Sequence, residues 1–491
     1  MKKATRIVIV VVVIAVVLLA LMTQSRRSRN AAALTAYKAE LRAKGEKLTF
    51  QELGFPRPPE SSSNLDLLVA GVKQLPANAI EPGSPECMRF VGMGRAEVIW
   101  ALPELRLPYP MASYSNTAPW KSFSAQFEAV SNALHQIRVA TQFPPRYVSH
   151  DPANFTNWPS AQWPAIRAAT FWLKGDCVVA LHAGQLERAA ADVHALSQLA
   201  QFYREDLWLV SHMVRSSIVN VGLGLTWEAL QAPGWSEKGL SAMQRDWEAF
   251  DLAEMFERGV VGERAWGESV ADQMRAMNPR QRLKLLRSLR IEGGKPPAWY
   301  TAKEYFAEFV GMPLWRANAE ADELLALKIQ QQSLESFRQL QAGTLVVEIQ
   351  RQLDAHVGAL DAVGTGWLAQ YHYLLCGYTL SHYPSTAIRF LHIETQRRLT
   401  VTALALERFR LRHGKLPPEL AALVPQFLSA VPLDLMSAKP LRYQLNADGS
   451  FMLYSVGEDG RDDGGEPNSA SGTNKFGLWE GKDAVWPTAV K

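Results

Sequence analysis

Four carboxylates lie within six positions near the end of the chain, at Glu458, Asp459, Asp462 and Asp463. Glycines alternate with them, so the backbone can turn sharply there. Crowded carboxylates repel one another unless water or a cation neutralises them. Oxygen ligands on a flexible loop suit Ca²⁺ better than Zn²⁺ or Mg²⁺, although Arg461 would occupy the third ligand position of an EF-hand. The loop therefore predicts a calcium site of another type, with a solvated acidic turn as the alternative.

A second set of acids is Glu257, Glu263 and Glu268, in a stretch that also holds Arg258 and Arg264. A glycosidase needs two carboxyl groups that face one cleft, roughly 5 to 9.5 Å apart. Glu263 and Glu268 are five positions apart, so their side chains diverge around a helix. The pattern therefore favours ion pairs between helices over a catalytic pair.

The histidines and cysteines form no recognisable site. His182 and His194 fall on successive predicted helices without a clustered acid or cysteine, which indicates structural roles. Cys87, Cys177 and Cys376 include no C-x-x-C pair, so we expect three small buried apolar side chains. The sequence also has no G-x-S-x-G elbow, Walker loop, Rossmann glycine fingerprint or H-E-x-x-H. These features together predict that the protein is not an enzyme.

The charge balance argues against a nucleic-acid partner. The net charge is +4, but six of the 52 Lys and Arg residues lie before residue 30, where there is no acid. The rest of the chain carries 46 basic against 48 acidic side chains. Nucleic-acid binding usually requires a basic face, so we expect no nucleic acid among the partners.

The basic residues at the start flank an apolar run of sixteen residues, Ile7–Met22. A membrane helix needs about 20 residues, within a range of ~17–25, and Thr5 and Thr23 extend the run to the short end of that range. No small-x-small cleavage site follows, so an uncleaved anchor at residues 1–25 is favoured over a cleaved signal peptide. We expect a single pass through the inner (cytoplasmic) membrane. Both flanks carry three basic residues, so charge does not set the orientation. The calcium-type loop and the short N-terminal tail favour an extracytoplasmic position for the bulk of the chain.

Residues 26–164 are predicted to be a juxtamembrane region with helices and many Pro and Trp residues. Thr49 and Glu52 have the spacing of a capping box. Helices are expected around Ser124–Arg138 and near Ala96.

Residues 165–383 are predicted to be an irregular domain of helical hairpins. The helices Ala165–His182 and Leu186–Tyr203, with small residues at their contact, resemble a tetratricopeptide unit. Leu207–Leu230 and Ser236–Phe256 are predicted to follow as single helices, with Ser236 as an N-cap. A true solenoid is not predicted, because no 34-residue period repeats three times.

Residues 384–491 are predicted to form a small α+β module. Ser385–Arg412 has the pattern of a long helix that Gly414 ends. Apolar and polar residues alternate in Leu441–Leu445 and Phe451–Val456, and an Asn-Ala-Asp-Gly turn joins these two strands. The fold class is therefore mainly α: a transmembrane helix, a large helical-hairpin domain and this small module.

The C-terminal pieces resemble, in their order, the globular part of the type II secretion major pseudopilin. The matching pieces are Thr402–Gly414, Lys415–Leu420, Val431–Asp434, Lys439–Tyr443, Tyr454–Gly460 and Gly464-Gly465. In that family a long helix leads through a small sheet to a calcium loop. The resemblance implies calcium ligands at the Val456 carbonyl, at Asp459 and at Asp483. The chain departs from the family because Leu435 follows Asp434 where the family has Pro, and because no pseudopilin cleavage motif precedes the apolar run.

The whole layout also resembles membrane-anchored proteins of planctomycete and verrucomicrobial type, a resemblance that implies no activity. It rests on Ala43–Leu53, Gly184–Asp192, Gly262–Ala265 and the C-terminal module. We therefore expect a membrane-anchored extracytoplasmic scaffold or interaction protein with a calcium-stabilised C-terminal lobe, a protein partner and a link to secretion or envelope assembly. The alternative is an envelope hydrolase that acts on glycan or peptide through helix-borne carboxylates.

Overall fold

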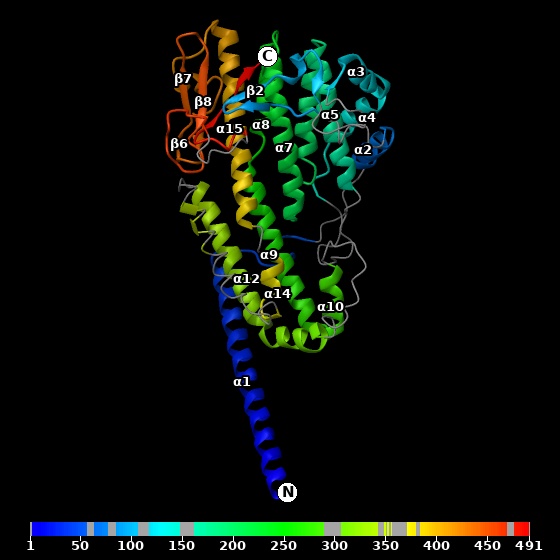
Figure 1. Ribbon diagram of the computed structural model, residues 1–491, viewed down its shortest axis with the longest axis vertical. Helices are drawn as coiled ribbons and strands as arrows, with labels where there is room; N and C mark the ends of the chain where they lie inside the picture. Colours follow the sequence, from blue (N-terminus) through cyan, green and yellow to red (C-terminus); the bar gives the residue numbers. More distant parts are fainter. Residues whose placement is uncertain are drawn as a thin grey trace.

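The computed structural model is mainly helical, with small sheets, and its first helix projects away from the rest of the molecule (Figure 1). It describes residues 2–55, 63–76, 85–106, 117–147, 162–288, 306–341, 348–349, 351–352, 355, 371–379, 383–468 and 476–490. The prediction of a mainly α protein is confirmed. None of the helices in these ranges is long and apolar enough to cross a membrane.

The α-helices are α1 (Lys2–Ala43), α2 (Ser63–Lys73), α3 (Trp120–Ala129), α4 (Ser131–Thr141), α5 (Trp163–His182), α6 (Leu186–Ala200), α7 (Leu209–Leu230), α8 (Glu237–Glu248), α9 (Leu252–Ala276), α10 (Pro279–Ser288), α12 (Met312–Gln341), α14 (Leu374–Thr379) and α15 (Tyr383–His413). A π-helical turn, η4 (Ala307–Gly311), precedes α12, and two 3₁₀ turns are η1 (Ile99–Ala101) and η6 (Leu420–Leu423). The strands are β1 (Arg89–Gly92), β2 (Arg95–Glu97), β3 (Leu105–Arg106), β4 (Thr117–Ala118), β5 (Leu433–Asp434), β6 (Lys439–Pro440), β7 (Arg442–Leu445), β8 (Phe451–Ser455), β9 (Ala484–Val485) and β10 (Thr488–Val490).

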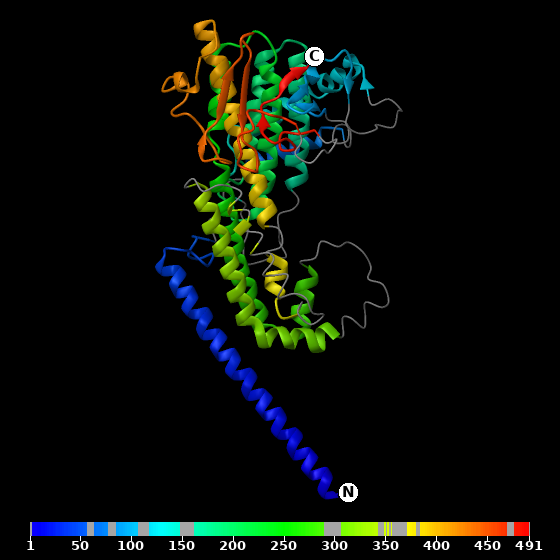
Figure 2. The same cartoon turned by 60° about the vertical axis from the view of Figure 1, so that its left-hand side comes forward.

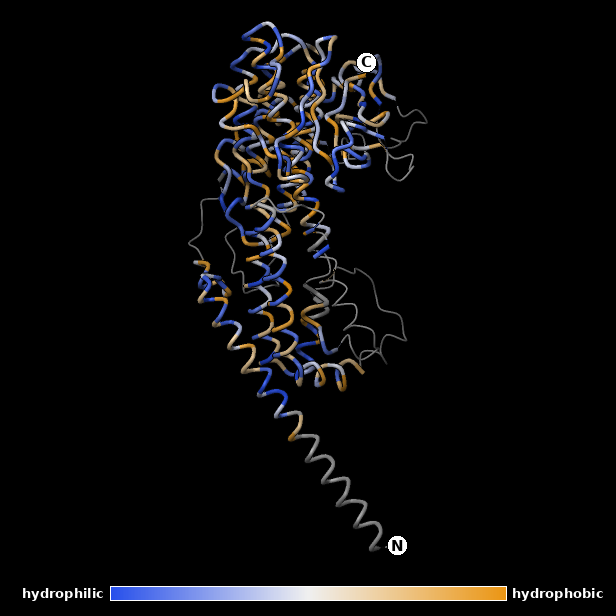
Figure 3. The backbone as a smooth tube through the Cα atoms, turned by 90° about the vertical axis from the view of Figure 1, so that its left-hand side faces the viewer, coloured by the Kyte–Doolittle hydropathy of each residue, from blue (hydrophilic) through white to orange (hydrophobic). Residues whose placement is uncertain are grey.

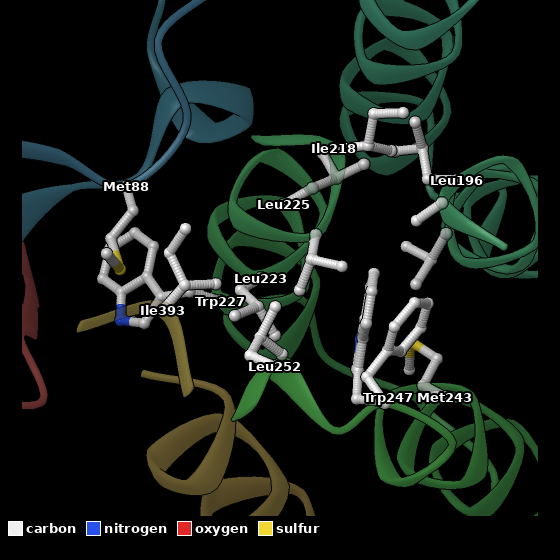
Figure 4. Packing of buried hydrophobic residues seen from close by; sticks show 14 of the residues in the cluster. Met88, Leu196, Ile218, Leu223, Leu225, Trp227, Met243, Trp247, Leu252 and Ile393 are labelled. Atoms are coloured by element: carbon white, nitrogen blue, oxygen red, sulfur yellow. The ribbon is translucent and has the colours of Figure 1, made fainter. Parts of the chain in front are cut away.

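Helices α5, α6, α7, α8 and α15, with the first half of α9, form the upper body, the end opposite the free end of α1 in Figure 1. Figure 3 shows hydrophobic and hydrophilic residues alternating along these helices, as expected for amphipathic helices around a core. Trp227 lies with Met88 and Ile393 in this core, and Trp247 lies with Met243 (Figure 4). A Cβ at Gly222 would lie 2.2 Å from the Trp247 ring, so this glycine allows α7 and α8 to approach closely.

The lower body is built from α1, α9 and α12, with α10 and α14 beside them (Figure 2). Charged side chains connect its three long helices. Lys38 of α1 lies 2.5 Å from Glu268 of α9 and also pairs with Glu323 of α12. Arg275 of α9 pairs with Glu323 as well. The second half of α1 is therefore part of the folded body.

A further buried pair lies where the chain leaves α1. The Glu46 carboxylate accepts hydrogen bonds from Arg264 of α9 at 2.8 Å and from Arg338 of α12 at 2.5 Å. Arg338 also pairs with Glu257 at 2.6 Å, as expected for ion pairs between helices. Arg264 is fully buried, so Glu46 provides the charge that compensates it.

The C-terminal strands pack on the helices and on the start of the chain. Strand β7 pairs antiparallel with β8, and β8 with β9. Strand β10 pairs parallel with β2, so that Ala489 lies beside Ala96. The Trp227 indole N–H donates to the Pro487 carbonyl at 3.1 Å. Residues of α2, of the upper-body helices and of β8 and β9 thus share one hydrophobic core, whereas Met274 and Trp315 of the lower body belong to a second cluster.

Several local predictions are confirmed. Helix α15 ends where Gly414 adopts a φ of +74°, and the β7–β8 hairpin turns at Gly449, with a φ of +82°. Ser236 is an N-cap that accepts the Gly239 N–H at 3.1 Å. The capping-box hydrogen bonds of Thr49 and Glu52 form, although they close a turn and not a helix.

Three predictions on helices are wrong. The segment near Ala96 forms β1 and β2, because its partners are β10 and the α7 end, far away in sequence. The helix predicted at Ser236–Phe256 is broken, since Asp251 caps α9 through hydrogen bonds to the N–H groups of Ala253 and Glu254. Ser124–Arg138 divides into α3 and α4 at Val130. Residues 356–370 of the predicted hairpin domain lie outside the described residues.

Candidate functional site

A cleft of about 490 Å³ opens between α7 and α15. Two segments from opposite ends of the chain complete its walls, residues 86–90 and residues 478–479. Its lining is mixed, with apolar side chains such as Met88, Phe390 and Trp479 and polar ones such as Ser216, Asn220 and Arg389. Pockets that bind small ligands typically have about 300–1,000 Å³ and a mainly apolar lining with a few polar groups. The cleft has the size of a binding site, with a more polar lining than such pockets usually have.

The two helices contribute through the ordinary helical spacing. On α15 the lining residues include Thr386, Arg389, Ile393 and Gln396, which follow one face of the helix. On α7 the lining runs from Met213 through Ser216, Ser217 and Asn220 to Gly224 with the same spacing. The α15 face contributes the Arg389 guanidinium group and the Gln396 side-chain amide to the cleft.

Glu228, near the end of α7, holds the third wall in place. Its buried carboxylate accepts the backbone N–H of Met88 at 3.0 Å and that of Ile99 at 3.0 Å. Burial raises the pKa of Glu228 to about 8, although these hydrogen bonds act in the opposite direction. Cys87, on the same wall, lies close to Gly224, where an added Cβ would be 3.7 Å from the Cys87 carbonyl oxygen. The wall is thus bound to α7 and does not depend on a ligand for its position.

Three polar side chains of α15 face the cleft without a hydrogen-bond partner in the described part of the chain. Gln396 is 7% exposed and Thr386 is 5% exposed, and neither side chain makes a hydrogen bond to the described part of the chain. Arg389 is exposed at the cleft and forms no hydrogen bond or ion pair with a described residue. By contrast, Glu394 on another face of the same helix binds both Arg397 and Arg398. Neither residue has a polar side-chain atom that is both fully buried and unpartnered, so Gln396 and Thr386 reach solvent through the cleft and could offer hydrogen-bonding groups to a ligand.

His392 connects the cleft to the acidic loop. Its ring stacks on Trp479, with 4.0 Å between ring centroids and 7° between the planes. Its Nε2 atom lies 2.6 Å from the Glu458 carboxylate. The contact with His392 lowers the pKa of Glu458. A change in the loop that moved Glu458 would therefore act directly on the cleft rim.

Three of the predicted calcium ligands, Asp459, Asp462 and Asp463, have exposed carboxylates that contact neighbouring protein groups. Asp462 accepts hydrogen bonds from Arg442 at 2.6 Å and from the Tyr454 hydroxyl at 3.0 Å, and Arg442 is the main cause of its lowered pKa. Asp459 accepts the N–H of Arg461 at 2.9 Å, as in an Asx turn. Asp463 is 3.9 Å from the Lys482 ammonium group.

The last two predicted ligands are buried. Asp483 accepts the N–H groups of Gly465 at 2.7 Å and Glu466 at 3.1 Å, and so holds the far end of the loop. Burial raises the pKa of Asp483. The backbone N–H of Val456 donates to Asp434 at 3.0 Å. Over the described residues, no three His, Cys, Asp or Glu side chains are grouped to hold a metal ion. Calcium binding at this loop stays a prediction.

Glu263 and Glu268, the acids of the alternative function, face different neighbours on α9. Glu263 accepts a hydrogen bond from the backbone of Leu209, and Glu268 pairs with Lys38 in the lower body. Burial raises the pKa of both to about 7. The two histidines considered above also contact neighbouring helices and loops, His194 with Asp246 at 2.9 Å and His182 with the Trp100 carbonyl oxygen at 2.8 Å. Neither acid lines the cleft.

No protein-family model, curated protein or solved structure matches this chain. The resemblance to the pseudopilin module therefore stays a prediction.

Sequence reasoning did not find Thr386, Arg389 or Gln396. Their spacing places them on one face of the helix, but polar residues at such a spacing are equally typical of a solvent-exposed face. These residues form a cleft only because α7 lies opposite them. Since α7 is more than 150 residues away in the sequence, local patterns do not reveal this neighbour.

Proposed function

We propose that the protein is a membrane-anchored, extracytoplasmic interaction protein that binds an extended, acidic segment of a protein partner in the cleft between α7 and α15. The apolar run Ile7–Met22 would be the single-pass anchor in the cytoplasmic membrane. The α5–α6 hairpin and its neighbours would be the tetratricopeptide-like scaffold, a class of structure that presents extended binding surfaces. The proposal includes a role in secretion or envelope assembly.

The observation that supports this proposal most is the set of polar side chains in the cleft that have no partner among the described residues. A glutamine side chain offers one acceptor and two donors, which match the C=O and N–H of a peptide bond. Arg389 offers a fork of donors suited to a carboxylate of the bound segment. The apolar lining would take the side chains between these polar contacts.

The acidic loop enters the proposal as a regulator of the cleft. The proposed pseudopilin-like lobe would bind Ca²⁺ through Val456, Asp459, Asp462, Asp463 and Asp483. Since neighbouring Glu458 contacts His392, which stacks on Trp479, calcium would order the cleft rim.

The hydrolase alternative has less support. The raised pKa values of Glu263 and Glu268 would suit a general acid. However, burial explains both values, and the two acids lie outside the cleft. Glu86 is the one carboxylate among the described residues that line it, whereas glycoside hydrolysis requires two.

A peptide selection tests the proposal. Full-length protein in lipid nanodiscs would be exposed to a displayed library of random nonapeptides, and the enriched peptides would be titrated against it. We expect enriched peptides to share an acidic residue, and Arg389→Glu to weaken their binding about tenfold or more. Arg410→Glu is the matched control, because Arg410 lies on the same helix 21 positions away and pairs with Glu407. Absence of enrichment, or equal binding by Arg389→Glu, would contradict the proposal.

A further inference from the structure

The segment that contains η4 and the start of α12 has two apolar faces. Ala307, Gly311, Met312 and Trp315 form the buried face. The exposed face consists of Phe309, Val310, Pro313 and Ala317, which have helical spacing. Phe309 is 66% exposed and Val310 is 43% exposed. A helix of a soluble protein normally carries polar residues on its exposed face, so this face is suited to an apolar environment.

The segment lies where α1 leaves the body. Glu320 of α12 binds Arg27 of α1 at 3.4 Å and Arg316 of its own helix at 3.1 Å. Glu308 of η4 pairs with Arg280 at the start of α10 at 3.0 Å. Figure 2 shows the beginning of this segment running across the lower end of the body, near the point where α1 departs.

The η4–α12 segment contacts α1 close to the point where the apolar run Ile7–Met22 ends. Arg27 is five residues after Met22, which corresponds to a rise of about 8 Å along a helix. The headgroup layer of a bilayer is about 5–8 Å thick on each side of the hydrocarbon core. Leu21 and Met22 are themselves exposed, at 62% and 65%. If the apolar run spans the membrane, the exposed face of η4 and α12 is at headgroup depth.

The charges at this level suit lipid headgroups. Arg26 and Arg29 of α1 are exposed and form no ion pair with any residue that the structure describes. The acids of the segment, Glu308 and Glu320, are already paired with arginines. Basic side chains near an anionic membrane surface are attracted by about 1 kcal/mol each.

We propose that residues 306–317 lie flat in the membrane interface, in the leaflet through which α1 leaves the membrane. Phe309 and Val310 insert at the boundary between headgroups and acyl chains, and Arg26 and Arg29 bind anionic headgroups. The lower body is thereby held against the bilayer, and the upper body with its cleft lies farther from it (Figure 2). This inference rests on the proposed membrane anchor.

Depth-dependent quenching tests the inference on the full chain in nanodiscs of mixed neutral and anionic lipids. An environment-sensitive dye would be attached to Phe309→Cys in a Cys87→Ser background, since Cys177 and Cys376 are buried. The control site is Leu411→Cys. Leu411 is 47% exposed and lies near the C-terminal end of α15, in the upper body. We expect lipids spin-labelled near the headgroup to quench the dye at Phe309 at least about twofold and to leave the dye at Leu411 unchanged.

The outcomes separate the two proposals. If the protein floats with lipid on a density gradient but the dye at Phe309 is not quenched, the interfacial segment is refuted while the anchor stands. If the protein does not float with lipid, the anchor is refuted and this inference with it. Equal quenching at both sites would also overturn it, because the body would then have no defined orientation.

Discussion

Glu46→Gln is expected to weaken the junction between α1 and the body. The Glu46 carboxylate accepts hydrogen bonds from Arg338, from fully buried Arg264 and from Gln331, at 2.5, 2.8 and 3.1 Å. Burial alone would raise the pKa of Glu46. The hydrogen bonds from Arg338, Arg264 and Gln331 outweigh this effect and lower the pKa to about 2, from an ordinary value of 4.5. The folded state therefore favours the charged carboxylate.

The size of the effect follows from this difference. A decrease of this size in pKa corresponds to about 3.4 kcal/mol of unfolding free energy at pH 7. Partial access of solvent reduces it, so we expect Glu46→Gln to cost about 2–3 kcal/mol. This value is near the lower limit of about 3–5 kcal/mol for breaking a buried ion pair. Because the folded pKa is depressed, the contribution of Glu46 is present above pH 4.5 and is lost as the pH falls toward 2. The difference between variant and wild type should therefore shrink to less than about half by pH 3.

Urea unfolding of the full-length protein in mild detergent, at pH 7 and at pH 3, measures both quantities. Glu40→Gln is the matched control, because Glu40 pairs with Lys44 and both side chains are more than half exposed, at 54% and 55%. The control should lie within about 0.5 kcal/mol of wild type. A cost of Glu46→Gln below about 1 kcal/mol at pH 7, or a difference from wild type that does not decrease between pH 7 and pH 3, would refute the reasoning.

Three other changes have definite expected outcomes. Gly222→Ala should destabilise by about 1–3 kcal/mol because its Cβ would meet Trp247, whereas Gly267→Ala, which meets no described atom within 4 Å, should not destabilise; thermal unfolding compares them. Because the pKa of Glu228 is raised to about 8, the folded state favours the protonated carboxyl group, and the free energy of unfolding of wild type should fall by up to about 3 kcal/mol between pH 6 and pH 9. Glu228→Gln should remove most of this decrease in denaturant titrations, and an equal decrease in both proteins would contradict the prediction. Calcium at 100-fold over its Kd should stabilise wild type by about 2.7 kcal/mol but not Asp459→Ala, and no thermal shift in wild type would leave the loop a solvated turn.

Local signals predicted the elements that depend on few neighbours. The α5–α6 hairpin, the β7–β8 hairpin and the end of α15 at Gly414 were all predictable, because each is encoded by periodicity and a turn or cap residue nearby. The break between α8 and α9 was missed, although Asp251 is a strong capping residue. Continuous helical periodicity across it concealed the cap.

The candidate site could not be predicted, because it depends on contacts between distant segments. Strand β2 pairs with β10, almost 400 residues later, and this pairing converts a predicted helix near Ala96 into a sheet. Gln396 looks like an ordinary polar residue of a long helix until α7 covers that face. The calcium site of the acidic loop stays a prediction, and in the structure Asp462 accepts from Arg442 while Asp483 accepts the Gly465 N–H.

Photo-crosslinking tests the central claim, that the cleft between α7 and α15 binds a partner segment, most directly. An acidic peptide from the selection, carrying a benzophenone group, would be crosslinked to the full-length protein in nanodiscs, and the adducts would be located by mass spectrometry. The account predicts adducts at cleft residues of both helices, such as Met213 and Ile393, that disappear in Arg389→Glu. Adducts confined to other surfaces, or adducts that persist in the variant, would contradict it.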